Sequence, residues 1–174
     1  MHESSRTTRV LQPPRLRFIL STLALAFFWD LIPKGGGGFW PEMTMAVLTF
    51  WALRDPQRVG VGAAFTLGVM LDVGRGAALG QEALAFVWVV YLAQRRAARI
   101  LWFGAWGQAL LLLPLWSLAL ALQAAVRLVA GGDWPGWGYF GSAVTLVLLW
   151  PILSHGLLWP QWRAARAGGS ASLS

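Results

Sequence analysis

Residues 51–72 read WALRDPQRVGVGAAFTLGVMLD and hold the end of one apolar segment, a charged turn and most of a second apolar segment. Pro56 lacks a backbone donor, so we expect it to end one helix and start the next. Small residues that recur every four positions share one face of a helix and let two backbones approach closely in lipid. The second segment has such a stripe: Gly60, Ala64, Gly68 and Asp72. The stretch predicts closely packed helices joined by a tight turn.

The composition of the whole chain predicts a membrane protein. The 174 residues are 57% hydrophobic and 12% charged, with a mean hydropathy of +0.57, whereas a soluble domain has about 25% charged residues. The chain has a net charge of +7. Such an excess is expected in a membrane protein, because basic residues collect in its cytoplasmic loops, and it does not require nucleic acid as a partner. The absence of cysteine excludes disulfides, thiolate metal sites and a thiol nucleophile.

Polar breaks divide the chain into six apolar segments, which predict an all-α bundle of six transmembrane helices. The second and fourth are shorter than the roughly 20 residues of a full span, so both full and partial crossings stay open for them. The fifth contains Pro114, which predicts a kink. The segments are Leu16–Ile32, Phe39–Leu53, Gln57–Val73, Gly80–Ala93, Ile100–Val129 and Tyr139–Trp159.

The distribution of basic residues predicts the orientation, because short cytoplasmic loops collect Lys and Arg. Eleven of the 14 basic residues fall on one side of the predicted spans: Arg6, Arg9, Arg15, Arg17, Arg54, Arg58, Arg95, Arg96, Arg99, Arg163 and Arg166. Only Lys34, Arg75 and Arg127 fall on the other. We therefore expect a single integral domain over 16–162 in the bacterial inner membrane, with cytoplasmic tails at 1–15 and 163–174.

Two rival organisations are disfavoured. A re-entrant hairpin of the second and third segments would bring Arg54 and Arg58 near the bilayer centre, at about 2.5 kcal/mol or more for each charge. The segment Phe18–Ile32 also has the features of a signal peptide, but the chain continues to be hydrophobic after it. We expect a retained first helix.

The 12 tryptophans exceed what two interfacial belts need. Trp40, Trp134, Trp137, Trp159 and Trp162 lie near predicted helix ends, where amphipathic rings favour the headgroup region. A packing role is expected for the others considered: Trp51, Trp88, Trp106, Trp116 and Trp150.

Several polar residues are candidates for function. The stripe from Gly60 to Asp72 serves either internal packing, which we favour, or a partner-facing surface. Asp72 either caps a neighbouring helix, pairs with Arg75 or Arg127, or binds a partner, and a structural role is preferred over proton transfer.

The inner loops carry two basic groups that enforce topology and face anionic headgroups. Anchoring is the expected role and a cytoplasmic partner surface is the alternative. The residues are Arg54 and Arg58 in one loop and Arg95, Arg96 and Arg99 in the other.

Catalysis has little support in the sequence. Ser154 and His155 are adjacent in one helix, so their side chains point about 100° apart and do not form a nucleophile and base pair. No catalytic, metal-binding or cofactor motif is recognisable. We expect no enzyme activity, no metal and no cofactor.

The same central stretch resembles the rod shape-determining protein MreD family. The resemblance rests on Trp51–Gly60, then Phe65, then Gly68-Val69-Met70-Leu71-Asp72, and then Gly80 followed by Glu82-Ala83-Leu84. It covers about residues 40 to 95 by motif and the remainder by topology. By this resemblance Pro56, Gly60, Phe65, Gly68, Asp72 and Gly80 are family positions that shape the fold.

The resemblance implies a non-enzymatic scaffold of the bacterial cell-wall elongation complex. Its implied partners are the single-pass protein MreC, the synthase pair of RodA and a class B penicillin-binding protein, and the MreB filament. It also implies the fold of the substrate-binding component of energy-coupling-factor transporters, which makes a small-molecule transport component the alternative function. The docking stripe of those components is absent, because Ala24 and Ala26 are two residues apart. A homodimer and a lipid between helices are left open.

Overall fold

The computed structural model describes residues 15–33 and 38–170, with side chains through residue 159. Every regular element in these ranges is helical, which confirms the all-α prediction for them. The helices are α1 (Leu16–Leu31), α2 (Met43–Arg54), α3 (Val61–Arg75), α4 (Gln81–Arg95), α5 (Ala97–Leu101), α6 (Ala105–Val129), η1 (Trp137–Phe140) and α7 (Gly141–Ser170).

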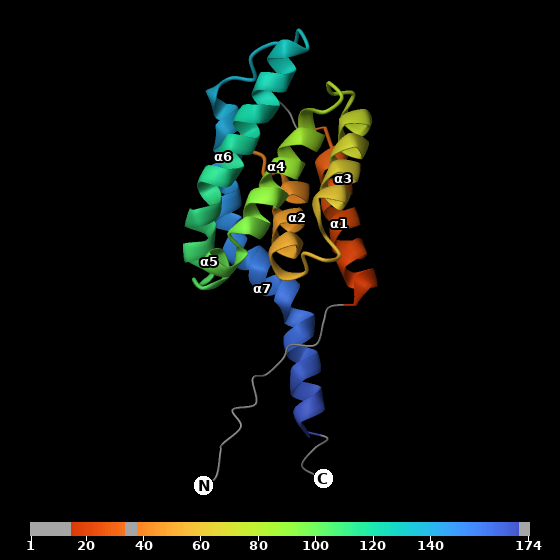
Figure 1. Ribbon diagram of the computed structural model, residues 1–174, viewed down its shortest axis with the longest axis vertical. Coiled ribbons are helices and arrows are strands. Elements are labelled where there is room, and N and C mark those ends of the chain that lie inside the picture. The colour runs from red at the N-terminus through yellow and green to blue at the C-terminus, as the bar shows by residue number, and fades with distance from the viewer. Residues whose placement is uncertain (1–14, 34–37, 171–174) are drawn as a thin grey trace.

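Six of these helices form a bundle in which successive helices run in opposite directions (Figure 1). Helices α1, α3, α4, α6 and α7 pack in that order around α2. Helix α2 is enclosed on all sides, since every residue from Thr44 to Leu53 is buried. The ring is open between α1 and α7, which pack on α2 but hardly on each other.

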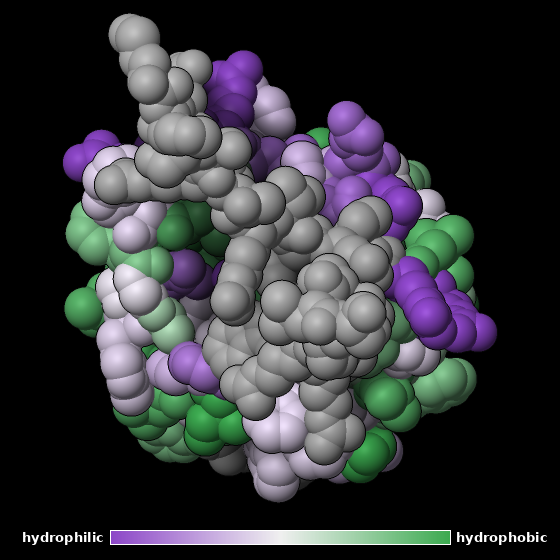
Figure 2. Space-filling model, turned by 90° about the horizontal axis from the view of Figure 1, so that it is seen from below, coloured by the Kyte–Doolittle hydropathy of each residue, from purple (hydrophilic) through white to green (hydrophobic). Residues whose placement is uncertain are grey.

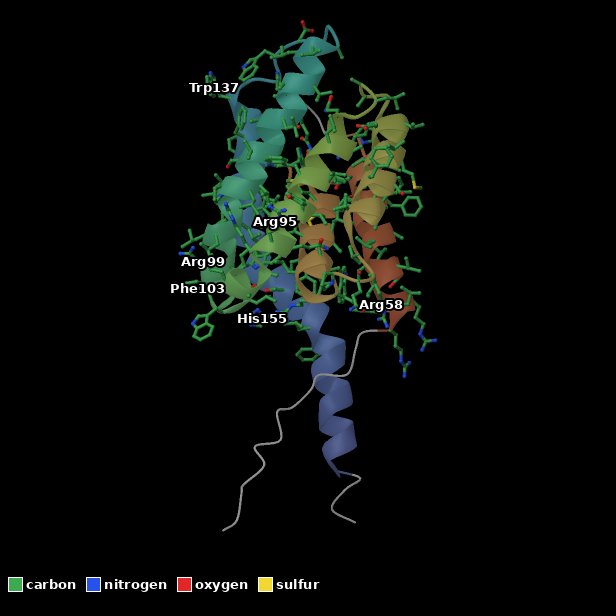
Figure 3. The ribbon with its side chains drawn as sticks, in the orientation of Figure 1. Arg58, Arg95, Arg99, Phe103, Trp137 and His155 are labelled. Carbon is green, nitrogen blue, oxygen red and sulfur yellow. The ribbon has the colours of Figure 1, made fainter. Side chains whose placement is uncertain are left out.

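The two ends of the bundle differ in character. The α2–α3 turn and the α4–α5–α6 connection lie at one end, which we call the arginine end because Arg58, Arg95 and Arg99 lie in that half of the molecule (Figure 3). The α3–α4 and α6–η1 connections lie at the other end (Figure 1). Seen from the arginine end, hydrophilic side chains occupy part of the rim beside hydrophobic ones (Figure 2).

The outer surface of the bundle is apolar while several charges lie inside it. Leu25 on α1, Val73 on α3 and Ile152 on α7 are 71%, 67% and 72% exposed. Asp72 and Glu82, in contrast, are 0% and 1% exposed. A water-soluble protein rarely exposes so many large apolar side chains, whereas a bilayer solvates them.

Trp51, Trp116 and Trp150 are buried in the core, as predicted. The indole N–H of each donates a hydrogen bond. Trp51 donates to Thr22 Oγ1 at 2.9 Å, Trp116 to Thr49 Oγ1 at 3.4 Å and Trp150 to Gln108 Oε1 at 3.3 Å. The packing prediction is wrong for two others: Trp88 and Trp106 are 41% and 59% exposed. They lie on the outward faces of α4 and α6. The position of a residue within a predicted span does not show whether its side of the helix faces inward or outward.

Helix boundaries differ from the predicted ones where side chains hold the backbone in turns. Helix α3 begins at Val61 instead of Gln57. An ion pair of 3.2 Å between Arg58 and Asp55 and a hydrogen bond of 3.0 Å from the Gln94 amide to the Val59 carbonyl hold the preceding residues in a turn. Helix α2 likewise begins at Met43, after Pro41 and Glu42, rather than at Phe39.

The last two predicted segments also change. The fifth segment divides into α5 and α6 at Trp102–Gly104, where the Gln108 side chain donates to the Phe103 carbonyl at 2.9 Å. Helix α7 continues past the predicted end at Trp159 to Ser170. Arg6, Arg9 and Lys34 lie outside the described residues, as do the side chains of Trp162, Arg163 and Arg166.

Two helical stretches among the described residues are long and apolar enough to cross a membrane, Ala105–Val129 and Trp137–Trp159. Helix α2 is apolar but shorter. Helices α1, α3 and α4 have 16, 15 and 15 residues, which at 1.5 Å per residue is about 22 to 24 Å. Four of the six helices are thus shorter than a full span, and six full membrane crossings stay a prediction.

Helices α3 and α4 approach each other very closely at Gly68. A Cβ atom on Gly68 would lie 2.3 Å from Ala83 Cα and 2.6 Å from Ala83 N, so no side chain fits there. We predict that Gly68→Leu forces α3 from α4 and destabilises the purified protein by about 1–3 kcal/mol or more, measured as a lower melting temperature in detergent.

Gly62→Leu on the same helix is the matched control, because a Cβ atom there would meet nothing within 4 Å. Equal melting temperatures of the two variants would show that the α3–α4 contact is not close-packed in the protein.

Candidate functional site

A cluster of buried polar side chains lies at the end of the bundle opposite the arginine end. We call it the polar network, and its members come from five helices and the segment before α2. They are Asp30, Glu42, Asp72, Arg75, Glu82, Gln123 and Tyr139. A polar cluster inside an apolar bundle needs a matched set of partners, because unpaired groups there are costly.

Asp72, the last residue of the small-residue stripe, caps helix α4. One carboxylate oxygen accepts the Glu82 backbone N–H at 2.8 Å and the other accepts the Gly80 N–H at 2.8 Å. Gly76 and Gly80 have φ of +62° and +97°, a backbone conformation that glycine adopts without strain. These two turns reverse the chain so that the start of α4 meets the end of α3.

Asp30 does the same for helix α2. Its carboxylate accepts the Thr44 N–H at 2.7 Å and the Met43 N–H at 3.3 Å. A carboxylate at a helix N-terminus satisfies backbone donors and interacts favourably with the helix dipole. In both cases the helix that starts at this end takes its cap from the end of the preceding helix.

Arg75 is the cation of the network. Its Nη1 lies 2.6 Å from Glu82 Oε1 and 4.0 Å from Glu42 Oε1. Its Nε donates to the Asp30 carbonyl at 3.0 Å, and its Nη2 lies 3.8 Å from Asp30 Oδ1. The guanidinium thus connects α1, α4 and the residue before α2.

Gln123 of α6 joins the two glutamates. Its amide nitrogen donates to Glu82 Oε2 at 2.6 Å and to Glu42 Oε2 at 3.1 Å. The Tyr139 hydroxyl, from η1, donates to the Gln123 amide oxygen. The network therefore extends from α1 across the bundle to the connection before α7.

The arrangement has a structural consequence that follows from its charges. Asp30, Asp72 and Glu82 are at most 2% exposed and Glu42 is 7% exposed, so Coulomb interactions here are strong and loss of a partner is costly. Backbone N–H groups, one guanidinium and one amide donate hydrogen bonds to these carboxylates. The polar network holds five helices together at this end of the bundle.

The structure separates the residues of the predicted stripe. Ala64, Gly68 and Asp72 are buried on the face of α3 that α4 covers. Gly60 precedes α3, and a Cβ atom there would meet only the Pro56 carbonyl, at 3.5 Å. The tight contact thus begins at Ala64.

The remaining predicted positions lie apart from the network, except Gly80. Pro56 is in the exposed turn before α3, and Phe65 on α3 is 54% exposed. The basic loop residues are all exposed, and two of them stack on rings: Arg54 lies 5.0 Å from the Phe50 ring centroid and Arg95 lies 4.4 Å from that of Tyr91. The others are Arg58, Arg96 and Arg99.

Sequence reasoning identified Asp72 but missed most of the network. Arg75 was considered only as a partner of Asp72, whereas its carboxylate contacts are with Asp30, Glu42 and Glu82. The available signal was that Asp30, Glu42, Asp72 and Glu82 all fall at helix ends on one predicted side. Gln123 and Tyr139 gave no such signal.

Ser154 and His155 have local partners. The Ser154 hydroxyl donates to the Pro151 carbonyl at 3.0 Å, and His155 Nδ1 lies 2.6 Å from the same oxygen. His155 is exposed towards the arginine end (Figure 3).

An apolar outer surface, a fully enclosed central helix and ion-paired acids in the interior are the features of an integral membrane protein of the helical-bundle class. The model of the family described as rod shape-determining protein MreD matches residues 13–161. The chain belongs to this family.

One relative is the rod shape-determining protein MreD of Haemophilus influenzae. It is 28% identical over 135 residues, which are 76% of this chain and 83% of the relative. No solved structure shows significant similarity to the chain. The expected likeness to the energy-coupling-factor component therefore stays a prediction.

We predict that Arg75→Gln destabilises the protein by about 3 kcal/mol or more, because it removes the cation from three buried carboxylates. The double substitution Arg75→Gln with Glu82→Gln removes a charge of each sign and should recover part of that loss. Thermal unfolding in detergent measures both.

Arg127→Gln is the matched control, since Arg127 is an exposed arginine in the last turn of α6, at the same end of the bundle as Arg75. A melting temperature for Arg75→Gln as high as that of Arg127→Gln would contradict the stabilising role of the network.

Proposed function

We propose that the chain is a non-enzymatic membrane scaffold of the bacterial cell-wall elongation complex. In this role it binds MreC and, with it, helps to regulate peptidoglycan synthesis by RodA and its class B penicillin-binding protein, alongside MreB. The observation that carries the proposal is the match of the rod shape-determining family to residues 13–161.

The physical character of the structure supports a scaffold. The buried polar groups of the network are engaged with one another and with backbone N–H groups. What the bundle presents outward is the apolar surface of its helices. Such a protein acts by binding other helices in the bilayer through close packing.

We further propose six crossings of the inner membrane with both termini in the cytoplasm. The alternating direction of α1, α2, α3, α4, α6 and α7 (Figure 1) supports this topology. The described arginines of the inner loops all lie at one end, as the bias of cytoplasmic loops requires. The polar network then lies at the periplasmic end.

The outward face of α3 is the surface we assign to MreC. Phe65 is a family position by resemblance, yet it is 54% exposed and does not contribute to the core. Met70 and Val73 on the same helix are 50% and 67% exposed. Large apolar side chains beside the rigid α3–α4 pair provide a preorganised surface for a single transmembrane helix.

Phe65→Ala should reduce the recovery of MreC when the tagged chain is purified from native membranes, while protein level stays unchanged. Phe28→Ala on α1 is the matched control, since Phe28 is 65% exposed. Unchanged MreC recovery by Phe65→Ala would contradict the assignment of this face. A copurifying small molecule in place of MreC would favour the alternative function, a transport component.

A further inference from the structure

The opening of the helix ring between α1 and α7 contains an apolar groove. Its floor is α2, through Met43 and Val47, and its walls are Leu25 and Trp29 of α1 and Gly156 of α7. The volume is about 330 Å³. Because the groove lies in the gap of the ring, it faces sideways, toward the bilayer in the proposed membrane placement.

The chemistry of the lining restricts the ligand to an apolar chain. Thr22 is the polar residue of the lining. Its hydroxyl is already engaged, since it donates to the Ile19 carbonyl at 2.9 Å and accepts the Trp51 indole N–H at 2.9 Å. The groove thus offers mainly the burial of apolar surface, with the Trp29 indole N–H as a further polar group of the lining.

The shape of the groove favours a narrow occupant. A helix about 10 Å wide would lie across its rim and insert single side chains. An extended hydrocarbon chain is narrow enough to enter between α1 and α7. A Cβ atom on Gly156 would meet nothing within 4 Å, so the wall is open at that point.

Positive charge lies at the arginine end of the same face of α1. Arg15 precedes Thr22 by seven residues, about two turns, which places it on the groove side of α1. Arg17 is two residues further along, at the same end of the helix but on its other side. Both are exposed. Half of the hydrocarbon core is about 15 Å thick, so a chain whose headgroup lies at this level extends into the groove.

We propose that the groove binds one acyl chain of an anionic phospholipid of the inner leaflet, with its phosphate at Arg15. This inference rests on the membrane placement proposed above. The lipid fills the gap where α1 and α7 do not pack on each other, so it completes the bundle that the partner proteins contact.

The test uses the full chain in nanodiscs of equal amounts of phosphatidylglycerol and phosphatidylethanolamine, released for native mass spectrometry. The wild type should retain one phosphatidylglycerol per chain. Gly156→Phe fills the groove and should lower this occupancy by about tenfold or more, because the chain loses its buried site. Gly62→Phe is the matched control, since it also has open space around its Cβ atom.

Two further variants keep the result interpretable. Leu25→Trp narrows the groove from the α1 side at a position that is 71% exposed, and it should lower occupancy as Gly156→Phe does. Arg15→Gln should leave one lipid bound and abolish the preference for phosphatidylglycerol.

Wild-type occupancy in both groove variants, or a wild-type protein that retains no lipid or shows no headgroup preference, would overturn the proposal. So would loss of MreC capture by Gly156→Phe with lipid occupancy unchanged, since a helix would then be the occupant. Failure of the scaffold proposal is distinct: the wild type would capture no MreC while its lipid occupancy stayed as expected.

Discussion

The contact between Arg75 and Glu82 sets the geometry of the whole bundle, because a charge buried among apolar helices must keep its partner. The 2.6 Å ion pair joins α3 to α4, and the same guanidinium reaches Asp30 and Glu42. Gln123 extends the contact to α6. Loss of any one helix from this arrangement would leave polar groups unpaired in a medium that does not solvate them.

This constraint explains why short helices suffice. Helix α2 has 12 residues, and its start is held by the Asp30 carboxylate, while the start of α4 is held by Asp72. The backbone donors of both helix starts are satisfied inside the protein, as lipid requires. The ends of the helices are therefore held together by side chains of the neighbouring helices.

The sequence predicted the parts of the fold that depend on local rules. Pro56 marks a turn because proline lacks a donor, and the spacing from Ala64 to Asp72 marks a packed face because small residues share one side of a helix. The grouping of arginines in alternate loops reflects insertion rules that act on short segments. Each of these signals is contained within one helix or one loop.

The rest depends on contacts between distant residues. Gln123 and Glu42 are 81 residues apart, and neither has a local pattern that identifies its partner. The break before α6 depends on Gln108 reaching the Phe103 carbonyl, in a stretch whose hydropathy is continuous. The enclosure of α2 follows from the order of helices around it, which periodicity in α2 itself does not encode.

The central claim is that lipid surrounds this bundle, with the polar network at the periplasmic end and the arginine loops in the cytoplasm. Because the chain has no cysteine, single cysteines introduced at two exposed positions report the side directly: Leu79→Cys between α3 and α4, and Trp102→Cys between α5 and α6. A membrane-impermeant thiol reagent on intact spheroplasts should label Leu79→Cys alone and should reach Trp102→Cys only after the membrane is permeabilised. Labelling of Trp102→Cys from outside, or equal labelling of both before permeabilisation, would contradict the account.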